Sequence, residues 1–108
     1  MGRASRDKGA RGELEVLQLV RDAGWTRATR NFASGAVGNG DLAHGPAGVV
    51  FEVKRTERLD LPGAYRQAVE AAGPHDLPVV AHRRSRDPWL ATLPLDELLA
   101  LLRLRECG

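Results

Sequence analysis

Two acidic residues and a lysine near the middle of the chain have the types and spacing of a metal-dependent hydrolytic site. Asp41 stands 11 residues before Glu52, which is followed by Val53 and Lys54. Side chains alternate along a strand, so Glu52 and Lys54 would share one face of an extended segment over residues 49–54. Two carboxylates can hold a hard cation such as Mg²⁺. The backbone carbonyl of Val53, which lies between Glu52 and Lys54 in the sequence, could be a further ligand. The lysine could orient the attacking water or stabilise the charge that develops when a phosphodiester is hydrolysed.

The pairing of Asp41 with Glu52 depends on a register that the sequence leaves open. If the chain turns through residues 45–47 and His44 pairs with Val49, Asp41 lies directly opposite Glu52. Their Cβ atoms would then be about 4.5–5.5 Å apart, an arrangement that is repulsive unless a cation lies between the carboxylates. A slip of one residue would put the two carboxylates on opposite faces.

A third carboxylate comes from the first predicted helix, over residues 8–23 and ended by Gly24. Glu13 falls near the middle of its apolar face, which is made of Ala10, Leu14, Val16, Leu17 and Val20. A carboxylate in that position needs a partner, which is either an arginine or the metal. Lys54 has a similar alternative to a catalytic role, a salt bridge to Asp41 or Glu52.

The rest of the pattern predicts the elements that position these groups. Strands are expected over residues 25–32, around Asp41, and over 49–54, 77–82 and 88–93. A second helix is capped by Asp60 and ended at residues 73–74, and a third covers residues 94–105. We expect a single α/β domain over residues 1–108, with helices packed on a mixed five-stranded sheet and a flexible basic arm over residues 1–7. The last helix holds more leucine than one face needs, and some of it could cover a partner subunit.

The composition excludes several classes of protein. The chain has 108 residues, a net charge of +2 and one cysteine, Cys107. A lone cysteine excludes a disulfide framework and a cysteine-based zinc site, and it fits a reducing cytoplasm. No apolar run is long enough to cross a bilayer and no signal peptide precedes the basic start, so we expect a cytoplasmic protein without a membrane partner.

Basic and amide side chains around the acidic set are candidates for contacts with nucleic acid. Only Lys8 and Lys54 are lysines among the 16 basic residues, and arginine suits bidentate phosphate recognition. For several of them a frayed terminus, a solvated hairpin tip or an ordinary surface position remains the alternative. The candidates are Arg3, Arg6, Lys8, Arg11, Arg30, Arg55, Gln67, Arg83, Arg84 and Arg86.

Asp41, Glu52-Val53-Lys54 and Glu13 together resemble the PD-(D/E)xK nuclease superfamily, with Gly40 where the motif has proline. The chain is most similar to archaeal-type Holliday junction resolvases and their phage-encoded relatives. That likeness rests on the run 8–13, Ser34-Gly35, the run 51–54, the strand 78–81 and Trp89.

The resemblance implies a restriction-endonuclease-like fold and a metal-dependent endonuclease that resolves four-way DNA junctions by paired nicks. It implies Mg²⁺, with Mn²⁺ as a substitute, held by Asp41, Glu52 and Glu13, and an auxiliary role for Ser34. It also implies a homodimer in a bacterial, archaeal or phage-infected cell. A nuclease of another specificity, restriction-like or branch-processing, and a non-cleaving DNA-binding module of the same fold remain open alternatives.

Overall fold

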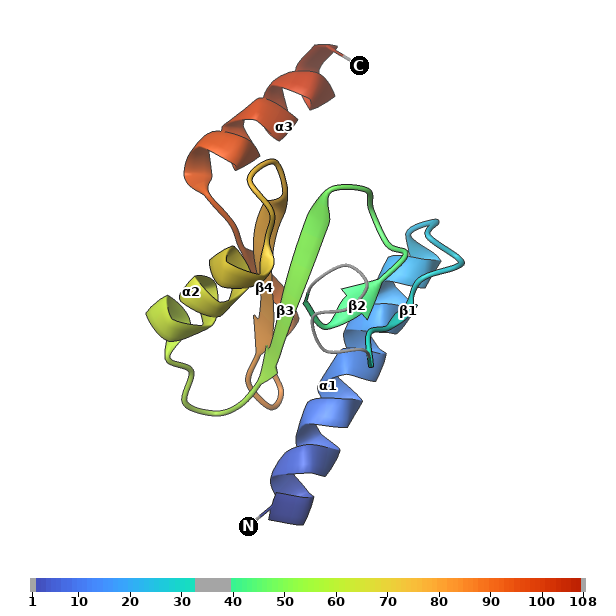
Figure 1. Ribbon diagram of the computed structural model, residues 1–108, viewed down its shortest axis with the longest axis vertical. Helices are drawn as coiled ribbons and strands as arrows, with labels where there is room; N and C mark the ends of the chain where they lie inside the picture. The colour runs from blue at the N-terminus through green and yellow to red at the C-terminus, as the bar shows by residue number, and fades with distance from the viewer. Residues whose placement is uncertain (1, 33–39, 108) are drawn as a thin grey trace.

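The computed structural model describes residues 2–32 and 40–107, and side chains from residue 9 onward. Three helices and five strands are distributed along this part of the chain (Figure 1). In chain order they are α1 (Gly2–Asp22), β1 (Thr29–Arg30), β2 (Leu42–Ala43), β3 (Val49–Arg55), α2 (Leu61–Ala71), β4 (Leu77–Arg83), β5 (Leu90–Thr92) and α3 (Leu95–Cys107). The chain is therefore an α/β protein, as its sequence pattern predicts.

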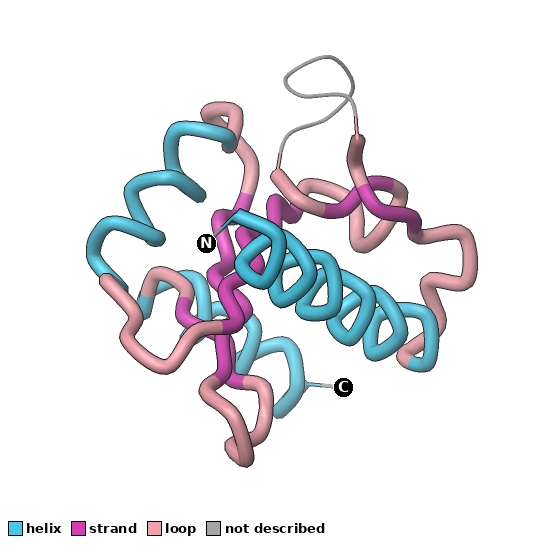
Figure 2. The backbone as a smooth tube through the Cα atoms, turned by 90° about the horizontal axis from the view of Figure 1, so that it is seen from below, coloured by secondary structure: helices cyan, strands magenta, loops and turns pink. Residues whose placement is uncertain are grey.

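A three-stranded sheet in the order β3-β4-β5 forms the centre of the molecule. β3 and β4 are parallel and joined through α2, whereas β5 runs antiparallel to β4. Figure 2 shows this sheet between α1 and α2. On the α1 side Val16, Leu17 and Val20 pack with Val53 and Ala81, and on the α2 side Ala64 and Ala68 pack with Val80. β3 is thus held from both faces, and its edge opposite β4 faces β2.

The expected five-stranded sheet is wrong, because the five strands form two sheets. β1 and β2 pair antiparallel with each other, Thr29 opposite Ala43 and Arg30 opposite Leu42. The predicted hairpin ladder in which His44 pairs with Val49 is not formed. Instead the backbone N–H of Asp41 donates to the Phe51 carbonyl at 2.8 Å, and the chain then turns away from β3. Gly48, with φ of 72°, supplies a left-handed position in the connection back to β3.

Several predicted boundaries also shift. α1 begins at Gly2, so the expected flexible arm is helical from that residue onward. The expected strand over residues 25–32 shrinks to Thr29–Arg30, because the chain first turns, with the Ala28 N–H donating to the Trp25 carbonyl. The second helix is confirmed: the Asp60 side chain accepts from the Gly63 N–H at 3.0 Å, and the helix ends before residues 73–74.

The molecule is elongated, 48 × 29 × 27 Å, because α1 and α3 extend beyond the sheet at opposite ends of the long axis (Figure 1). None of the residues of α3 is buried. Among the described residues, we find no helix with both the length and the apolar character needed to cross a membrane.

Candidate active site

A cavity of about 380 Å³ brings the predicted acidic residues together at the edge of β3. Its wall is formed by α1, the residue before β2, and the second half of β3. The lining residues are Gly9, Glu13, Asp41, Glu52, Val53, Lys54, Arg55 and Thr56. The three carboxylates, the lysine and the backbone carbonyl position singled out from the sequence therefore border one space.

Asp41 is fixed by hydrogen bonds to β3 on both its backbone and its side chain. Its N–H donates to the Phe51 carbonyl, and its Oδ2 accepts from the Val53 N–H at 2.7 Å. The Asp41 carboxylate thus replaces the backbone carbonyl that a neighbouring strand would offer to the Val53 N–H. In an extended strand the N–H and C=O of one residue point to the same side, so the Val53 carbonyl also faces this edge.

Gly40 allows this approach. Its φ of 88° lies in the region that favours glycine, and a Cβ at this position would stand 2.6 Å from the Phe51 carbonyl oxygen. A Cβ would also stand 2.8 Å from Val50 Cγ1. Proline, which the superfamily motif has at this position, fixes φ near −65° and would not fit this backbone. Glycine in place of the motif's proline therefore fits the positive φ of residue 40.

The pKa values of both carboxylates on this edge, Asp41 and Glu52, are raised. Burial is the main cause that raises the pKa of Asp41, opposed chiefly by the hydrogen bond from the Val53 N–H. Burial, and then the charge of Asp41, raise the pKa of Glu52 from 4.5 to about 6. Desolvation thus destabilises the charged form of both carboxylates, and a neighbouring carboxylate adds to it, Glu13 at Asp41 and Asp41 at Glu52. A bound divalent cation would relieve this condition.

Lys54 lies beside these carboxylates on the same face of β3 as Glu52. Its Nζ is 3.8 Å from Glu52 Oε1, which makes an ion pair longer than a hydrogen bond. Its positive charge lowers the pKa of both Asp41 and Glu52, but by less than burial raises it. The salt-bridge alternative for Lys54 is therefore observed, at a distance that leaves the amine room to move toward a substrate.

Glu13 has the arginine partner that the sequence left as one of two alternatives. Arg30 on β1 donates from Nε at 3.0 Å and from a terminal nitrogen at 2.8 Å, both to Oε1. The Arg30 guanidinium also lies over the Phe32 ring, 4.7 Å from its centroid. The Glu13 charge still raises the pKa of Asp41 and Glu52, so it belongs to the same electrostatic site.

The described residues contain no group of three His, Cys, Asp or Glu side chains close enough to form a ready metal site. With Glu13 turned to Arg30, the donors on hand are the carboxylates of Asp41 and Glu52 and the carbonyl of Val53. This set fits Mg²⁺, which is usually held by one or two carboxylates and keeps several waters. It fits zinc or copper poorly, because the cavity wall contributes neither histidine nor cysteine.

A second polar cluster, which the sequence analysis missed, lies behind the cavity and centres on Glu15. Glu15 Oε1 accepts from Arg83 at 2.8 Å and from the Trp89 indole N–H at 3.0 Å. Arg55 Nε lies 3.5 Å from Glu15 Oε2 and is buried without a hydrogen bond. Gly12 makes room, since a Cβ there would stand 3.0 Å from Arg55 Cβ. The parallel register that places Arg55 opposite Arg83 brings the two arginines side by side, and this register is a property of the tertiary fold that no local sequence signal gives.

The predicted DNA contacts divide into paired, exposed and undescribed residues. Arg30, Arg55 and Arg83 are partly buried in the ion pairs given above, and Arg84 binds Asp87 at 3.0 Å. Arg11, Gln67 and Arg86 are exposed. The side chains of Arg3, Arg6 and Lys8, and the whole of Ser34, lie outside the described residues. Their roles stay predictions.

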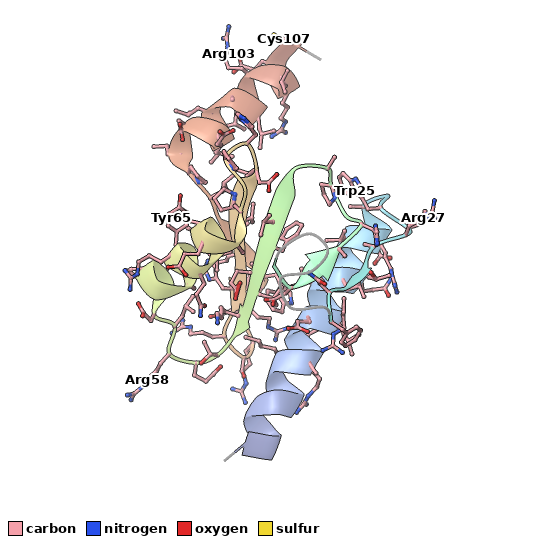
Figure 3. The ribbon with its side chains drawn as sticks, in the orientation of Figure 1. Trp25, Arg27, Arg58, Tyr65, Arg103 and Cys107 are labelled. Atoms are coloured by element: carbon pink, nitrogen blue, oxygen red, sulfur yellow. The ribbon has the colours of Figure 1, made fainter. Side chains whose placement is uncertain are left out.

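Gln67 lines a second cavity of about 440 Å³ that adjoins the first. Lys54 and Thr56 belong to the walls of both cavities, and Arg58, Asp60 and Gly63 belong to the second. The two spaces therefore form one concave strip across the end of β3, with Lys54 between them. Figure 3 shows Arg58 projecting outward below the end of β3.

Comparisons of the chain with protein-family models, with curated proteins and with solved structures find no match. The functional interpretation therefore depends on the residues and geometry of this cavity.

Proposed function

We propose that the chain is a metal-dependent, structure-selective DNA endonuclease that nicks four-way junctions by phosphodiester hydrolysis. The observation that carries the proposal is the cavity at the edge of β3, where Asp41, Glu52, Lys54 and Glu13 converge. Three carboxylates around one cavity are electrostatically costly without a cation, and a lysine among them suits an anionic substrate.

Each residue has a role that its surroundings support. Asp41 and Glu52, with the Val53 carbonyl, would hold Mg²⁺ or Mn²⁺, and Glu13 joins them when Arg30 releases it. The bound ion would polarise the scissile phosphate and lower the pKa of a water. Lys54 is free to move between Glu52 and the phosphate and would stabilise the negative charge that develops on it. The Val53 N–H keeps Asp41 in place throughout, because its bond comes from a strand that is packed on both faces.

The preference for branched DNA and the dimeric state come from the resemblance to junction resolvases. Two copies of the site, each nicking one of two opposed strands, would give the paired nicks. The fold contributes an α/β arrangement of α1, β3, α2 and β4 around the motif, and the restriction-endonuclease-like fold comes from the resemblance alone. The two arginines that bind Glu15 could exchange this partner for phosphates on the DNA.

The test is a cleavage panel with the purified protein and Mg²⁺. Substrates of matched sequence are a four-way junction, a flap, a nicked duplex and a linear duplex. The variant is Asp41→Asn, which keeps an oxygen to accept the Val53 N–H but removes the charge. The matched control is Asp22→Asn on the exposed end of α1.

The proposal predicts symmetrically placed nicks in the junction, none with a chelator, and a loss of at least about 100-fold in the Asp41→Asn rate. Asp22→Asn should cleave like the unmodified chain. Cleavage of all four substrates at one rate would support a nuclease of other specificity. Tight junction binding without any cleavage would support the non-cleaving module and refute the proposal.

A further inference from the structure

The C-terminal helix α3 carries a leucine stripe that nothing in the described chain buries. It contains six leucines, and none of them is buried. The exposed fractions range from 36% at Leu98 to 69% at Leu104. Leu95, Leu98, Leu99 and Leu102 follow a spacing of three and four residues and form one stripe, whereas Leu101 and Leu104 lie off it. Exposed apolar patches of this kind mark interaction sites.

The position of α3 leaves this stripe accessible. The helix leaves the sheet after β5 and extends along the long axis, so that its far end, with Arg103 and Cys107, lies away from the body (Figure 3). None of the residues of α3 is buried by the rest of the described chain, so the leucine stripe is open to a partner.

The charges of α3 identify that partner as a second copy of the chain. The first turn carries Asp96 and Glu97, and the last turns carry Arg103, Arg105 and Glu106, so the two ends have net charges of −2 and +1. If two copies pair antiparallel, the acidic end of each meets the basic end of the other, whereas a parallel pair would bring like charges together. The Arg103–Glu106 ion pair within the helix is exposed at 3.7 Å and can be exchanged. A self-complementary surface is what a two-fold symmetric dimer requires.

We infer that two copies of this chain associate through α3, antiparallel and about a two-fold axis that passes near Leu99. The leucine stripe forms the centre of the contact and the charged turns form its ends. A helix of 13 residues is about 20 Å long and is a small interface by itself.

Sedimentation velocity over a range of protein concentrations tests the surface with a closely matched pair of variants. Leu99 on α3 and Leu19 on α1 are exposed helical leucines with fractions of 53% and 52%. Leu99→Glu would place two carboxylates at the two-fold axis and should raise the dissociation constant of the dimer at least about 100-fold. Leu19→Glu should leave the dimer unchanged, and both variants should keep the circular dichroism of the parent. A chain that stays monomeric at all concentrations, or a Leu99→Glu dimer of parental affinity, overturns the inference.

Disulfide trapping tests the direction of the pair. In an antiparallel pair centred on Leu99, the two Cys107 residues lie at opposite ends, about 24 Å apart by helical rise. A disulfide needs Cα atoms about 4.4–6.8 Å apart, so oxidised parent protein should give no Cys107–Cys107 dimer. Leu99→Cys in a Cys107→Ser background should cross-link fully. The reverse result, a link through Cys107 and none through residue 99, shows a parallel pair and refutes the proposed geometry.

The inference gives the proposed homodimer its contact surface, but its tests use neither DNA nor metal. A chain that dimerises through α3 and does not cut DNA would refute the nuclease proposal alone. A monomeric chain that cuts would refute the α3 dimer alone.

Discussion

Replacing Gly40 by alanine tests the placement of Asp41 on β3. Gly40 and Gly48 both have positive φ, 88° and 72°, but they differ in their surroundings. A Cβ on Gly48 meets nothing within 4 Å, whereas a Cβ on Gly40 would stand 2.6 Å from a backbone oxygen of β3. The pair therefore separates the cost of the left-handed backbone from the cost of the close approach.

The expected magnitudes follow from these two terms. A left-handed backbone costs a residue with a Cβ roughly 1–2 kcal/mol, which applies to both variants. Overpacking adds about 1–3 kcal/mol at Gly40 alone, because the Phe51 carbonyl belongs to a strand held from both faces and cannot yield. We therefore expect a loss of about 1–2 kcal/mol for Gly48→Ala and about 2–5 kcal/mol for Gly40→Ala. For a chain of this size the second value is a large part of the total stability.

Urea unfolding measured by circular dichroism gives both values, and titration with Mn²⁺ gives the consequence for the site. Gly40→Ala should weaken Mn²⁺ binding, because relieving the clash moves Asp41 off the Val53 N–H. Gly48→Ala should bind Mn²⁺ like the parent chain. If the two variants lose the same stability within about 0.5 kcal/mol, Gly40 does not lie against β3 and the account of Asp41 fails.

Three further predictions concern the charges around the cavity. Because the pKa of Glu52 is raised to about 6, the folded chain binds a proton that the unfolded chain releases near its ordinary value of 4.5. Without metal, the free energy of unfolding should therefore fall by up to about 2 kcal/mol as pH rises from about 4 to 7, and Glu52→Gln should flatten the profile; urea titrations that show a rise instead would contradict the assignment. Glu15→Ala removes the carboxylate that pairs with Arg55 and Arg83 and accepts from the Trp89 indole. It should lower the free energy of unfolding by about 1–3 kcal/mol in the same measurement, against less than about 0.5 kcal/mol for the exposed control Gln18→Ala on the same helix. Arg30→Leu removes a cation beside the carboxylates and releases Glu13, so Mg²⁺ affinity by calorimetry should rise several-fold; an unchanged or weaker affinity would show that Glu13 does not face the ion.

The positions of α2 and β3 could be predicted because the residues within each element are enough to indicate it. The Asp60 cap and the apolar run of β3 indicate their elements without reference to the rest of the chain. The division into two sheets could not be predicted in this way, because it depends on tertiary contacts at the edge of β3. At that point the Asp41 side chain replaces a backbone ladder partner, and the chain leaves the strand after a single backbone hydrogen bond.

The sequence indicates which side chains border the cavity better than it indicates how they pair, and their functional role stays a prediction. The approach of Asp41 to Glu52 follows from their spacing, although it arises from a side-chain bond to Val53 and not from the assumed ladder. The partner of Glu13 depends on where Arg30 lies, seventeen residues away on another element. The role of Glu15 could not be predicted, because helical periodicity cannot show that the ends of two parallel strands bring arginines against it.

The most direct test of the proposed hydrolytic site is single-turnover cleavage of an end-labelled four-way junction by the parent chain, Glu52→Gln and the exposed control Glu70→Gln. We predict Mg²⁺-dependent nicks at symmetric positions for the parent and for Glu70→Gln, and a rate at least about 100-fold lower for Glu52→Gln. Equal cleavage by all three proteins, or no cleavage by the parent, would contradict the assignment of hydrolysis to the cavity at the edge of β3.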